Sequence, residues 1–441
     1  MVTPEIREWP LQSGTLRPDL VGLQAAHPQR YPGLFLSSGD SGWDMLFAFP
    51  RDIVRISAAG GLNALQSHPA MQLQPTSQDP LDLPFSGGWL CAFAYELGSL
   101  FEPSVELAND ADYPLAWLTR IPAAILFDRA NGRCVLMAEA GQAGLLDRMQ
   151  RDLAGLPPPL PAVPELRALT EDEPAAFLAG VARIQDYIRA GDVFQVNLSR
   201  GWRAEFAEPV PAASLFGRLM QMNPAPFSAL LQMDEWAIVS SSPERLVRLD
   251  RNGRLETRPI AGTHPRSEDA TEDAALRARL QAHPKERAEH VMLVDLERND
   301  LGRVCEPGSV KVEALMETTS YRHVHHIEST VCGQLRQGMR VYNALRAVFP
   351  GGTITGCPKV RTMQIIRELE QTPRRSYTGS VGYINRDGSF DFNILIRSFL
   401  LCGNELSFRA GAGIVADSVA ACELDETRAK ARGLLRALEP T

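Results

Sequence analysis

The sequence predicts an α+β fold. Strand-like runs come from three distant parts of the 441-residue chain, 34–138, 193–260 and 380–410. They do not alternate with helices as in a series of βαβ units, which would form a parallel sheet. No internal repeat is present. The chain is therefore expected to pack several long strands from distant segments beside a few helices.

The first region, residues 1–155, is mostly strand-like. Strands are expected at 34–36, before Pro50, at 87–96, at 121–127 and at 134–138. The first of these runs into a turn at 37–40, and residues 128–132 are expected to form the turn of a hairpin between the last two. A helix over 142–153 closes the region.

Five prolines between residues 156 and 164 predict a stiff connector and a domain boundary. The second region, 165–441, begins with Thr170-Glu171-Asp172-Glu173. This pattern is typical of a capping box and predicts that a helix starts here, with Gly191 at its end.

The remaining helices and strands are predicted from the spacing of apolar residues and from the positions of turn residues. Strands are expected at 193–202, 227–233, 236–241, 245–249, 255–260, 380–384, 392–402 and 405–410. Helices are expected at 268–282, 285–302 and 420–438.

The helix over 285–302 carries a carboxylate toward the buried side. Glu289 lies three and four residues before Met292 and Leu293, which belong to the apolar stripe of the helix. A buried carboxylate needs a cation, a proton or an arginine. Two hypotheses follow: an internal salt bridge, for example to Arg298, or a metal ligand that acts with a second carboxylate.

The last helix offers such carboxylates. Glu423 and Glu426 share one face, and Glu426 precedes Lys430 by four residues. The helix alone is better explained as a solvated surface helix with an ordinary Glu–Lys pair. The preceding segment, 409–415, contains Gly411 and Gly413. Its small side chains let the backbone approach a ligand, or simply make a tight packing turn.

Composition excludes several classes of function. The net charge is −8, with 44% hydrophobic and 22% charged residues, so nucleic acid or an anionic membrane is not expected as the main partner. Seven scattered cysteines without a CxxC pair argue against disulfides and zinc, and they favour a reduced, cytoplasmic enzyme. The glycine-rich segment 349–359 lacks the Gly-Lys-Ser/Thr ending of a nucleotide-binding loop.

Several motifs together resemble the chorismate-utilising enzyme family. They occur in the family's order at 241–245, 258–263, 287–300, 351–356, 396–397, 410–415 and 423–430. The resemblance implies a large two-sheet β core flanked by helices. It also implies that an N-terminal half (1–155) packs against a C-terminal, chorismate-binding catalytic half (165–441).

The resemblance also implies roles for individual residues. Mg²⁺ would be held by Glu289 and Glu426, with Glu423 close behind, in an all-oxygen site. The catalytic positions would be Glu244 as general acid, His326, Thr263 and position 261, where some members have a lysine. Chorismate would be bound by Thr353, Tyr377, Arg397, Lys430, Gly411 and Gly413.

The residue type at position 195 indicates which nucleophile the enzyme uses. Members that add water have a lysine base in a segment similar to 194–200, and here the corresponding residue is Gln195. Water is a poor nucleophile and needs that base, whereas ammonia has its own lone pair. The sequence therefore resembles the members that aminate chorismate.

Two aminating reactions remain. Aminodeoxychorismate synthases aminate C4, and many of them use a lysine nucleophile in the motif Pro-Ile-Lys-Gly-Thr. Anthranilate synthases aminate C2 and eliminate pyruvate. Here Ala261 occupies the position of the lysine, as is typical of anthranilate synthases. Segments 36–38, 87–98 and 101–102 instead resemble component I of the aminodeoxychorismate synthases, a group that serves p-aminobenzoate and folate synthesis. We favour this group, with C4 amination that does not pass through a covalent enzyme intermediate.

No Cys-His-Glu glutaminase constellation is visible in the sequence. Ammonia is therefore expected from solution or from a separate glutamine amidotransferase subunit. A hypothesis of another class is a non-catalytic, amino-acid-binding regulator built on the same fold, since Ser37 and 226–228 resemble positions around the family's tryptophan pocket. The presence of Glu244, Glu289, Arg397 and Glu426 argues against it.

Overall fold

The computed structural model describes residues 3–11, 17–37, 42–58, 60–76, 83–108, 110–155, 157–267, 269–282, 284–320 and 324–439. Its helices are α1 (Leu20–Ala26), α2 (Gly61–Ser67), α3 (Gly98–Phe101), α4 (Ala143–Ala154), α5 (Pro174–Arg189), α6 (Ala212–Met222), α7 (Ala270–Ala282), α8 (Pro284–Gly302), α9 (Val341–Val348), α10 (Lys359–Glu370) and α11 (Ala420–Leu438). None of the helices in this described part of the chain is long and apolar enough to cross a membrane.

The strands form two sheets. Those of the first are β1 (Glu5–Trp9), β2 (Gly33–Leu36), β3 (Trp43–Ala48), β7 (Ala123–Asp128), β8 (Arg133–Ala138), β9 (Leu166–Glu171), β10 (Gln195–Phe206), β11 (Phe227–Met233), β12 (Trp236–Ser242), β18 (Gly356–Cys357), β21 (Ser398–Cys402) and β22 (Glu405–Ile414). Those of the second are β4 (Arg51–Ile56), β5 (Gly88–Phe93), β6 (Ala116–Ile121), β13 (Arg245–Leu249), β14 (Arg254–Thr257), β15 (Ile260–Pro265), β16 (Lys311–Ser320), β17 (Val324–Gln334), β19 (Ser380–Asn385) and β20 (Phe390–Asn393).

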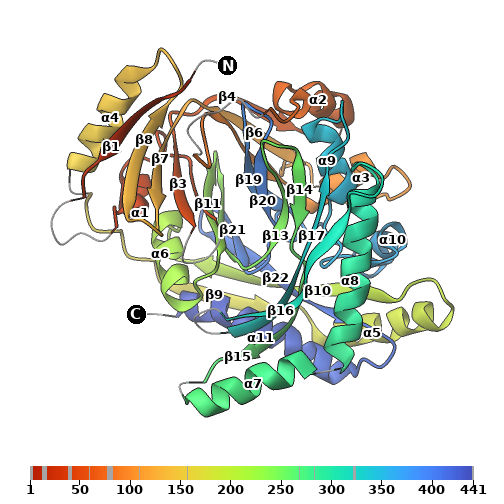
Figure 1. Cartoon of the computed structure of the whole chain (residues 1–441). Coiled ribbons are helices and arrows are strands. Elements are labelled where there is room, and N and C mark those ends of the chain that lie inside the picture. Colours follow the sequence, from red (N-terminus) through yellow and green to blue (C-terminus); the bar gives the residue numbers. More distant parts are fainter. Residues whose placement is uncertain are drawn as a thin grey trace.

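The two sheets face each other, and helices cover their outer sides (Figure 1). Between the sheets, the inward side chains of β2, β3 and β11 pack against those of β5 and β19 in one apolar cluster. The helices α6 and α11 pack on the outer face of the first sheet, and α8 lies against β17 of the second. The predicted α+β fold with a two-sheet core is confirmed.

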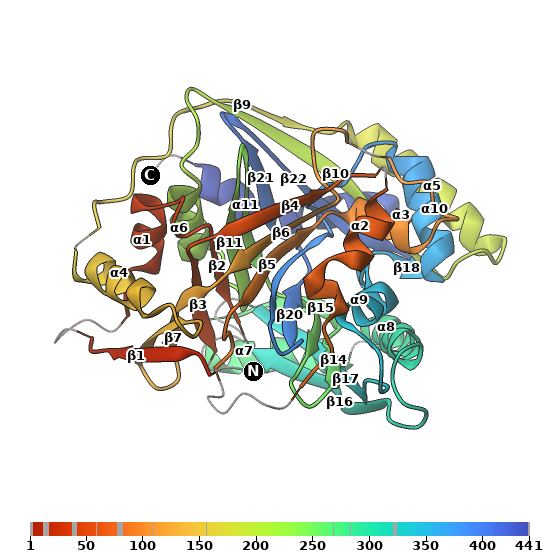
Figure 2. The same ribbon diagram turned by 90° about the horizontal axis from the view of Figure 1, so that it is seen from above.

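Strands from both ends of the chain are neighbours in both sheets. The order in the first sheet is β1-β8-β7-β3-β2-β11-β12-β21-β22-β10-β18. Strand β2, before the proline-rich connector in the sequence, thus pairs with β11, which follows it. In the second sheet β5 lies between β6 and β19. Figure 2 shows how the N-terminal strands β4, β5 and β6 lie beside C-terminal elements. The boundary at 156–164 stays a prediction about the organisation of the chain.

Two local predictions are wrong. Residues 170 and 171 belong to β9, which pairs with β10, and α5 begins after Glu173 with a proline in its first turn and no side-chain cap. The predicted strand 392–402 is two strands in different sheets, β20 and β21, separated by 394–397. The predicted turn at 37–40 lies largely outside the described residues.

A buried ion network ties β13 to its neighbours. The Arg245 guanidinium donates to both oxygens of Asp391 on β20 (2.9 and 3.0 Å) and to Glu256 on β14 (2.9 Å). Because all three side chains are at most 4% exposed, removing one partner leaves an uncompensated charge in the interior.

We expect Asp391→Ala to lower the free energy of unfolding by about 3–5 kcal/mol. Urea unfolding followed by circular dichroism measures it. Asp295→Ala is the matched control, because Asp295 pairs with Arg298 on the surface of α8, and such pairs contribute about 0–1 kcal/mol. An equal, small effect of both variants would contradict the assigned role of the buried network.

Candidate active site

A cavity of about 770 Å³ opens where the two sheets meet α8 and α11. Strands β10 and β22 of the first sheet and β15 and β17 of the second contribute to its walls. All predicted site residues except Thr263 line it: Glu244, Ala261, Glu289, His326, Thr353, Tyr377, Arg397, Gly411, Gly413, Glu423, Glu426 and Lys430. The structure thus brings together residues that are up to 186 positions apart, from 244 to 430.

Thr263 lies next to the cavity on β15. Its backbone is opposite His326 on β17, in a register that shifts between Ala261 and Thr263. The Thr263 side chain is outside the described residues, so its predicted catalytic role stays a prediction.

Glu289 projects from α8 into the cavity, as the helical period predicts. It accepts a hydrogen bond from the Gln195 side-chain amide and not from Arg298, which pairs with Asp295. Gly413 provides the space for this contact. A Cβ atom there would lie 2.2 Å from the Gln195 amide nitrogen and 3.0 Å from a Glu289 oxygen, so this glycine is required by close approach.

The carboxylates of α11 face the same cavity. Glu423 is 7% exposed, which excludes the solvated helix face considered for it. Glu426 is half exposed and pairs with Lys430 at 2.6 Å, and the Lys430 ammonium also donates to the Gly411 carbonyl at 3.0 Å. Lys430 is thereby held at the cavity wall as a fixed positive charge.

The donor set suits a hard cation. Glu289, Glu423 and Glu426 present carboxylate oxygens, and Mg²⁺ commonly takes one or two protein carboxylates together with substrate oxygens and water. In the described part of the chain, no three His, Cys, Asp or Glu side chains gather closely enough to hold a metal by themselves. The residues present therefore fit a site that a bound, oxygen-rich substrate would complete.

Glu244 follows β12 and is 4% exposed. Burial raises its pKa to about 8, while the Thr353 hydroxyl and the Ile260 backbone act in the opposite direction. The side chain is therefore mainly protonated at neutral pH. A protonated carboxyl that borders a cavity can donate its proton to a leaving group.

His326 is buried on β17, and burial lowers its pKa to about 4. Its Nδ1 lies 3.4 Å from the Gly262 carbonyl oxygen. A neutral imidazole at this position can donate or accept a hydrogen bond without adding charge to the cavity.

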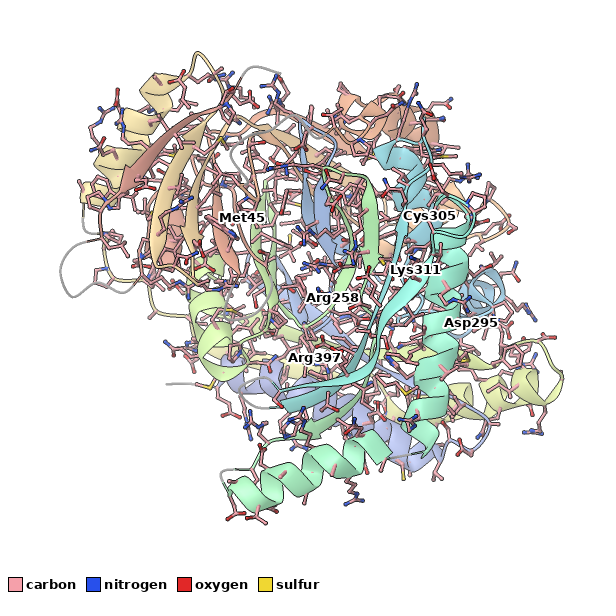
Figure 3. The ribbon with its side chains drawn as sticks, in the orientation of Figure 1. Met45, Arg258, Asp295, Cys305, Lys311 and Arg397 are labelled. Atoms are coloured by element: carbon pink, nitrogen blue, oxygen red, sulfur yellow. The ribbon has the colours of Figure 1, made fainter. Side chains whose placement is uncertain are left out.

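Arg397 lies in the segment that separates β20 from β21. Its φ is 53°, a left-handed conformation that is unusual for a residue with a side chain. The break that the sequence did not predict is thus the feature that turns this arginine into the cavity. Burial lowers its pKa, and Tyr377, Glu244 and Glu426 act against that effect. Figure 3 shows Arg397 where the lower ends of the sheets approach α11.

Besides Gln195, three polar cavity residues are absent from the predicted set: Asn197, Asn223 and Arg409. Strand alternation could have found Asn197, because it lies two residues after Gln195 on the same face of β10. The carbonyl oxygens of the Gln195 and Asn197 side chains are buried and have no hydrogen-bond partner among the described residues. Such groups cost free energy unless a ligand or water binds them, so they indicate a ligand site.

Comparisons with known proteins agree with this site. A family model described as chorismate binding enzyme matches residues 34–436. Aminodeoxychorismate synthase component 1 of Klebsiella aerogenes is 39% identical over 399 residues, which cover 88% of this chain and 85% of that protein. Anthranilate synthase component 1 of Thermus thermophilus is 41% identical over 378 residues, covering 83% and 80%.

A solved structure gives the same result for the fold. The crystal structure of anthranilate synthase component I from Streptococcus pneumoniae matches with a TM-score of 0.79 and 31% identity over 90% of this chain and 93% of that one.

The fold and the cavity, with its acids and fixed cations, define an enzyme that acts on a small anionic molecule. The chain belongs to the chorismate binding enzyme family, and it is a chorismate-utilising enzyme. Relatives named for two different reactions match it at similar identity, so overall identity does not separate these reactions.

Proposed function

We propose that the protein is component I of an aminodeoxychorismate synthase, which replaces the C4 hydroxyl of chorismate with an amino group from ammonia. The observation that carries amination is Gln195. Its amide donates to Glu289 and cannot take a proton, so the cavity wall has no base at the position where water-adding relatives have a lysine.

Regiochemistry at C4 is supported by the N-terminal half. The segment that resembles aminodeoxychorismate synthases contains Glu96, whose oxygens accept the backbone N–H groups of Arg374 (2.6 Å) and Arg375 (3.0 Å). These residues lead into Tyr377, which lines the cavity. The N-terminal motif therefore fixes a wall of the substrate site, and differences in it can decide how chorismate is oriented.

Ala261 argues for substitution without a covalent enzyme intermediate. Its side chain lines the cavity and is 8% exposed, and a methyl group cannot attack chorismate. Ammonia would then attack directly. As Glu244 gives its proton to the C4 hydroxyl, the C4–O bond breaks and water leaves. The nitrogen lone pair forms the new C–N bond, and the extra proton on nitrogen returns to the Glu244 carboxylate.

The other groups bind and orient. Arg397 and Lys430 offer positive charge to the two carboxylates of chorismate, and the Tyr377 hydroxyl and the backbone at Gly411 border the same space. Glu289 and Glu426, with Glu423, would hold Mg²⁺. When bound, this ion would neutralise a substrate carboxylate and fix the orientation of the ring.

The alternative is component I of an anthranilate synthase, and Ala261 is the residue that favours it. The same cavity could present C2 instead of C4 to ammonia, with pyruvate eliminated. In either case the names of the relatives as component 1 support a second component, for which a glutamine amidotransferase that supplies ammonia is our proposal.

Product analysis tests the assignment. Purified protein is mixed with chorismate, Mg²⁺ and an ammonium salt at mildly alkaline pH, and the products are separated by chromatography with mass detection. We expect a product that retains the enolpyruvyl group and yields p-aminobenzoate when a lyase is added. Anthranilate with free pyruvate would overturn C4 amination and make Ala261 the better guide.

A further inference from the structure

A buried arginine outside the catalytic cavity contacts three residues of the cavity wall. The Arg374 guanidinium donates to the backbone carbonyl of Asn197 on β10 (2.8 Å) and to that of Ile354 (3.1 Å). It also lies over the Tyr377 ring, with 5.5 Å between the guanidinium carbon and the ring centroid. Asn197, Ile354 and Tyr377 all line the catalytic cavity, whereas Arg374 does not. The arginine therefore touches this wall from outside and does not contact a molecule bound in the cavity.

Glu370, at the end of α10, fixes the position of this arginine. Its two carboxylate oxygens accept from the Arg374 guanidinium at 2.9 and 2.6 Å, and both side chains are 1% exposed. One of these oxygens also accepts from the backbone N–H and the hydroxyl of Ser199 on β10, each at 2.8 Å. A bidentate arginine–carboxylate pair has a defined geometry. The Glu370–Arg374 pair thus holds α10 and β10 in a fixed relation.

Every N–H group of the Arg374 guanidinium has an acceptor. Two donate to Glu370, two donate to the backbone carbonyls of the cavity wall, and one donates to the Thr378 hydroxyl at 3.3 Å. Arginine carries five N–H donors in a rigid plane, so these bonds use all of them. Lysine has three donors on a single nitrogen and cannot reach acceptors on all sides. Position 374 therefore requires an arginine and not only a positive charge.

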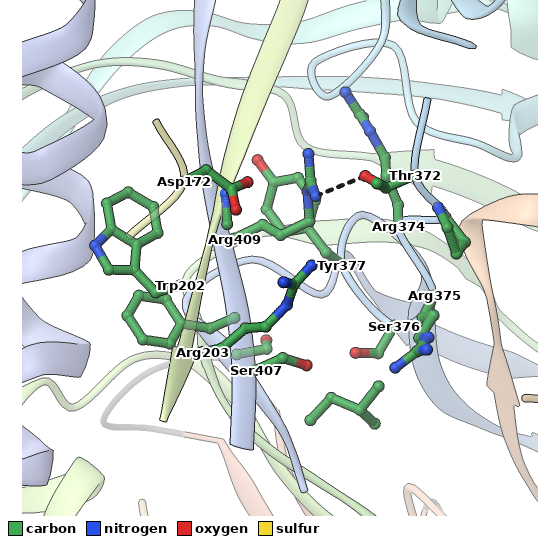
Figure 4. A pocket seen from close by; sticks show the side chains of 15 residues that line it. Asp172, Trp202, Arg203, Thr372, Arg374, Arg375, Ser376, Tyr377, Ser407 and Arg409 are labelled. Atoms are coloured by element: carbon green, nitrogen blue, oxygen red, sulfur yellow. Dashed lines mark hydrogen bonds between the residues drawn. The ribbon is translucent and has the colours of Figure 1, made fainter. Parts of the chain in front are cut away.

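The N-terminal half holds the other side of Arg374. The Tyr95 ring centroid is 4.7 Å from the guanidinium carbon, and the Glu96 carboxylate accepts from the Arg374 backbone N–H. Arg374 and Tyr377 also border a separate hollow of about 160 Å³, which Figure 4 shows. Tyr377 thus has open space beside it as well as the catalytic cavity, and its contact with Arg374 restrains it between the two.

We propose that the Glu370–Arg374 pair positions Tyr377 for chorismate, so that the Tyr377 hydroxyl meets a carboxylate of the substrate. The proposal rests on the proposed function, in which this hydroxyl borders the space for the substrate carboxylates. Neither Glu370 nor Arg374 lines the cavity, so the pair takes no part in the chemical step. Its loss weakens the binding of chorismate more than it slows the reaction of bound chorismate.

Arg374→Lys tests the proposal, because it keeps a positive charge beside Glu370 and loses bonds to the cavity wall. We expect the KM for chorismate to rise about tenfold or more and kcat to change by less than about threefold. The alkaline limb of the pH profile of kcat, which reports Glu244, should stay unchanged. In a Tyr377→Phe background, Arg374→Lys should change the KM by less than about twofold, because its effect passes through the missing hydroxyl.

Arg361→Lys is the matched control, because Arg361 is also on α10 but pairs with Asp192 at the surface and does not line the cavity. Circular dichroism identifies the variants that are folded. Should Arg374→Lys not fold, Glu370→Gln, which keeps the size of the side chain, makes the same comparison. An unchanged KM for chorismate in the folded variant overturns the role of the pair, and so do effects of the variant and of Tyr377→Phe that multiply.

Two readouts separate this proposal from the proposed function. Kinetics follow the consumption of chorismate, so they do not depend on whether C4 or C2 is aminated. Calorimetric titration with chorismate in the presence of Mg²⁺ gives the affinity without turnover. A wild-type protein that binds chorismate but does not consume it with ammonium overturns the proposed function, and the comparison of affinities among the same variants still decides the role of the pair.

Discussion

Replacing Glu289 with glutamine is expected to lower kcat by about a thousandfold without unfolding the protein. The substitution keeps the size of the side chain and removes its charge. The amide cannot serve as an anionic ligand of Mg²⁺, and it would meet the Gln195 amide where the carboxylate now accepts a hydrogen bond. Glu426→Gln is expected to act in the same direction, because Glu426 faces the same cavity.

Two measurements check this prediction. Steady-state rates with chorismate and ammonium give kcat, and calorimetric titration of Mg²⁺ in the presence of chorismate gives the metal affinity independently of turnover. Glu306→Gln, an exposed residue just after α8, is the control. Unchanged activity and metal affinity in both Glu289→Gln and Glu426→Gln would refute the metal assignment. An inactive wild-type protein that still binds amino acids would favour the non-catalytic regulator.

Glu244→Gln is expected to lower kcat by about 10²–10⁴ with little change in the KM for chorismate. Glutamine fills the same space at the end of β12, but it has no acidic proton to give to the departing hydroxyl. A large increase in KM at unchanged kcat would show that Glu244 binds substrate and does not donate a proton.

The pH dependence provides a second, independent check of Glu244. A general acid must be protonated, so activity is present below its pKa and is lost as the pH rises through it. Because burial raises the pKa of Glu244 to about 8, kcat should fall above about pH 8 in the wild type. The residual activity of Glu244→Gln should lack this alkaline limb. If kcat of the variant also falls above about pH 8, a group other than Glu244 causes the loss of activity.

Local sequence signals predict the elements that depend on local interactions. The helix α8, the hairpin of β7 and β8, and α11 agree with the predicted ranges within a few residues, because period, turn and capping residues act over short distances. The capping box at 170–173 is wrong because pairing with β10 provides more hydrogen bonds to this backbone than a side-chain cap does. Strands β16 and β17 are absent from the sequence-based assignment; β16 pairs with β17, whose other partners, β14 and β15, are distant in sequence.

The site could be predicted in part from the residues and in larger part from resemblance. The helical period alone directs Glu289 to the buried side. No local sequence pattern places Glu244 or Arg397 beside Glu289. Glu244 lies in the loop that leads from β12 of the first sheet to β13 of the second, and Arg397 lies in the segment between β20 and β21. Arg409 escapes prediction for a related reason: its partners Ser199, Glu370 and Thr372 come from distant segments that only the folded structure brings together.

The position of β5 has a consequence for the synthesis of the protein. It pairs with β6 early in the chain, but its other neighbour, β19, ends at residue 385. A nascent chain on the ribosome therefore carries an unpaired strand edge, flanked by apolar residues, until nearly nine-tenths of the sequence has been translated. Such edges promote aggregation, so production of this enzyme should be sensitive to translation speed and to chaperones that bind unpaired strands.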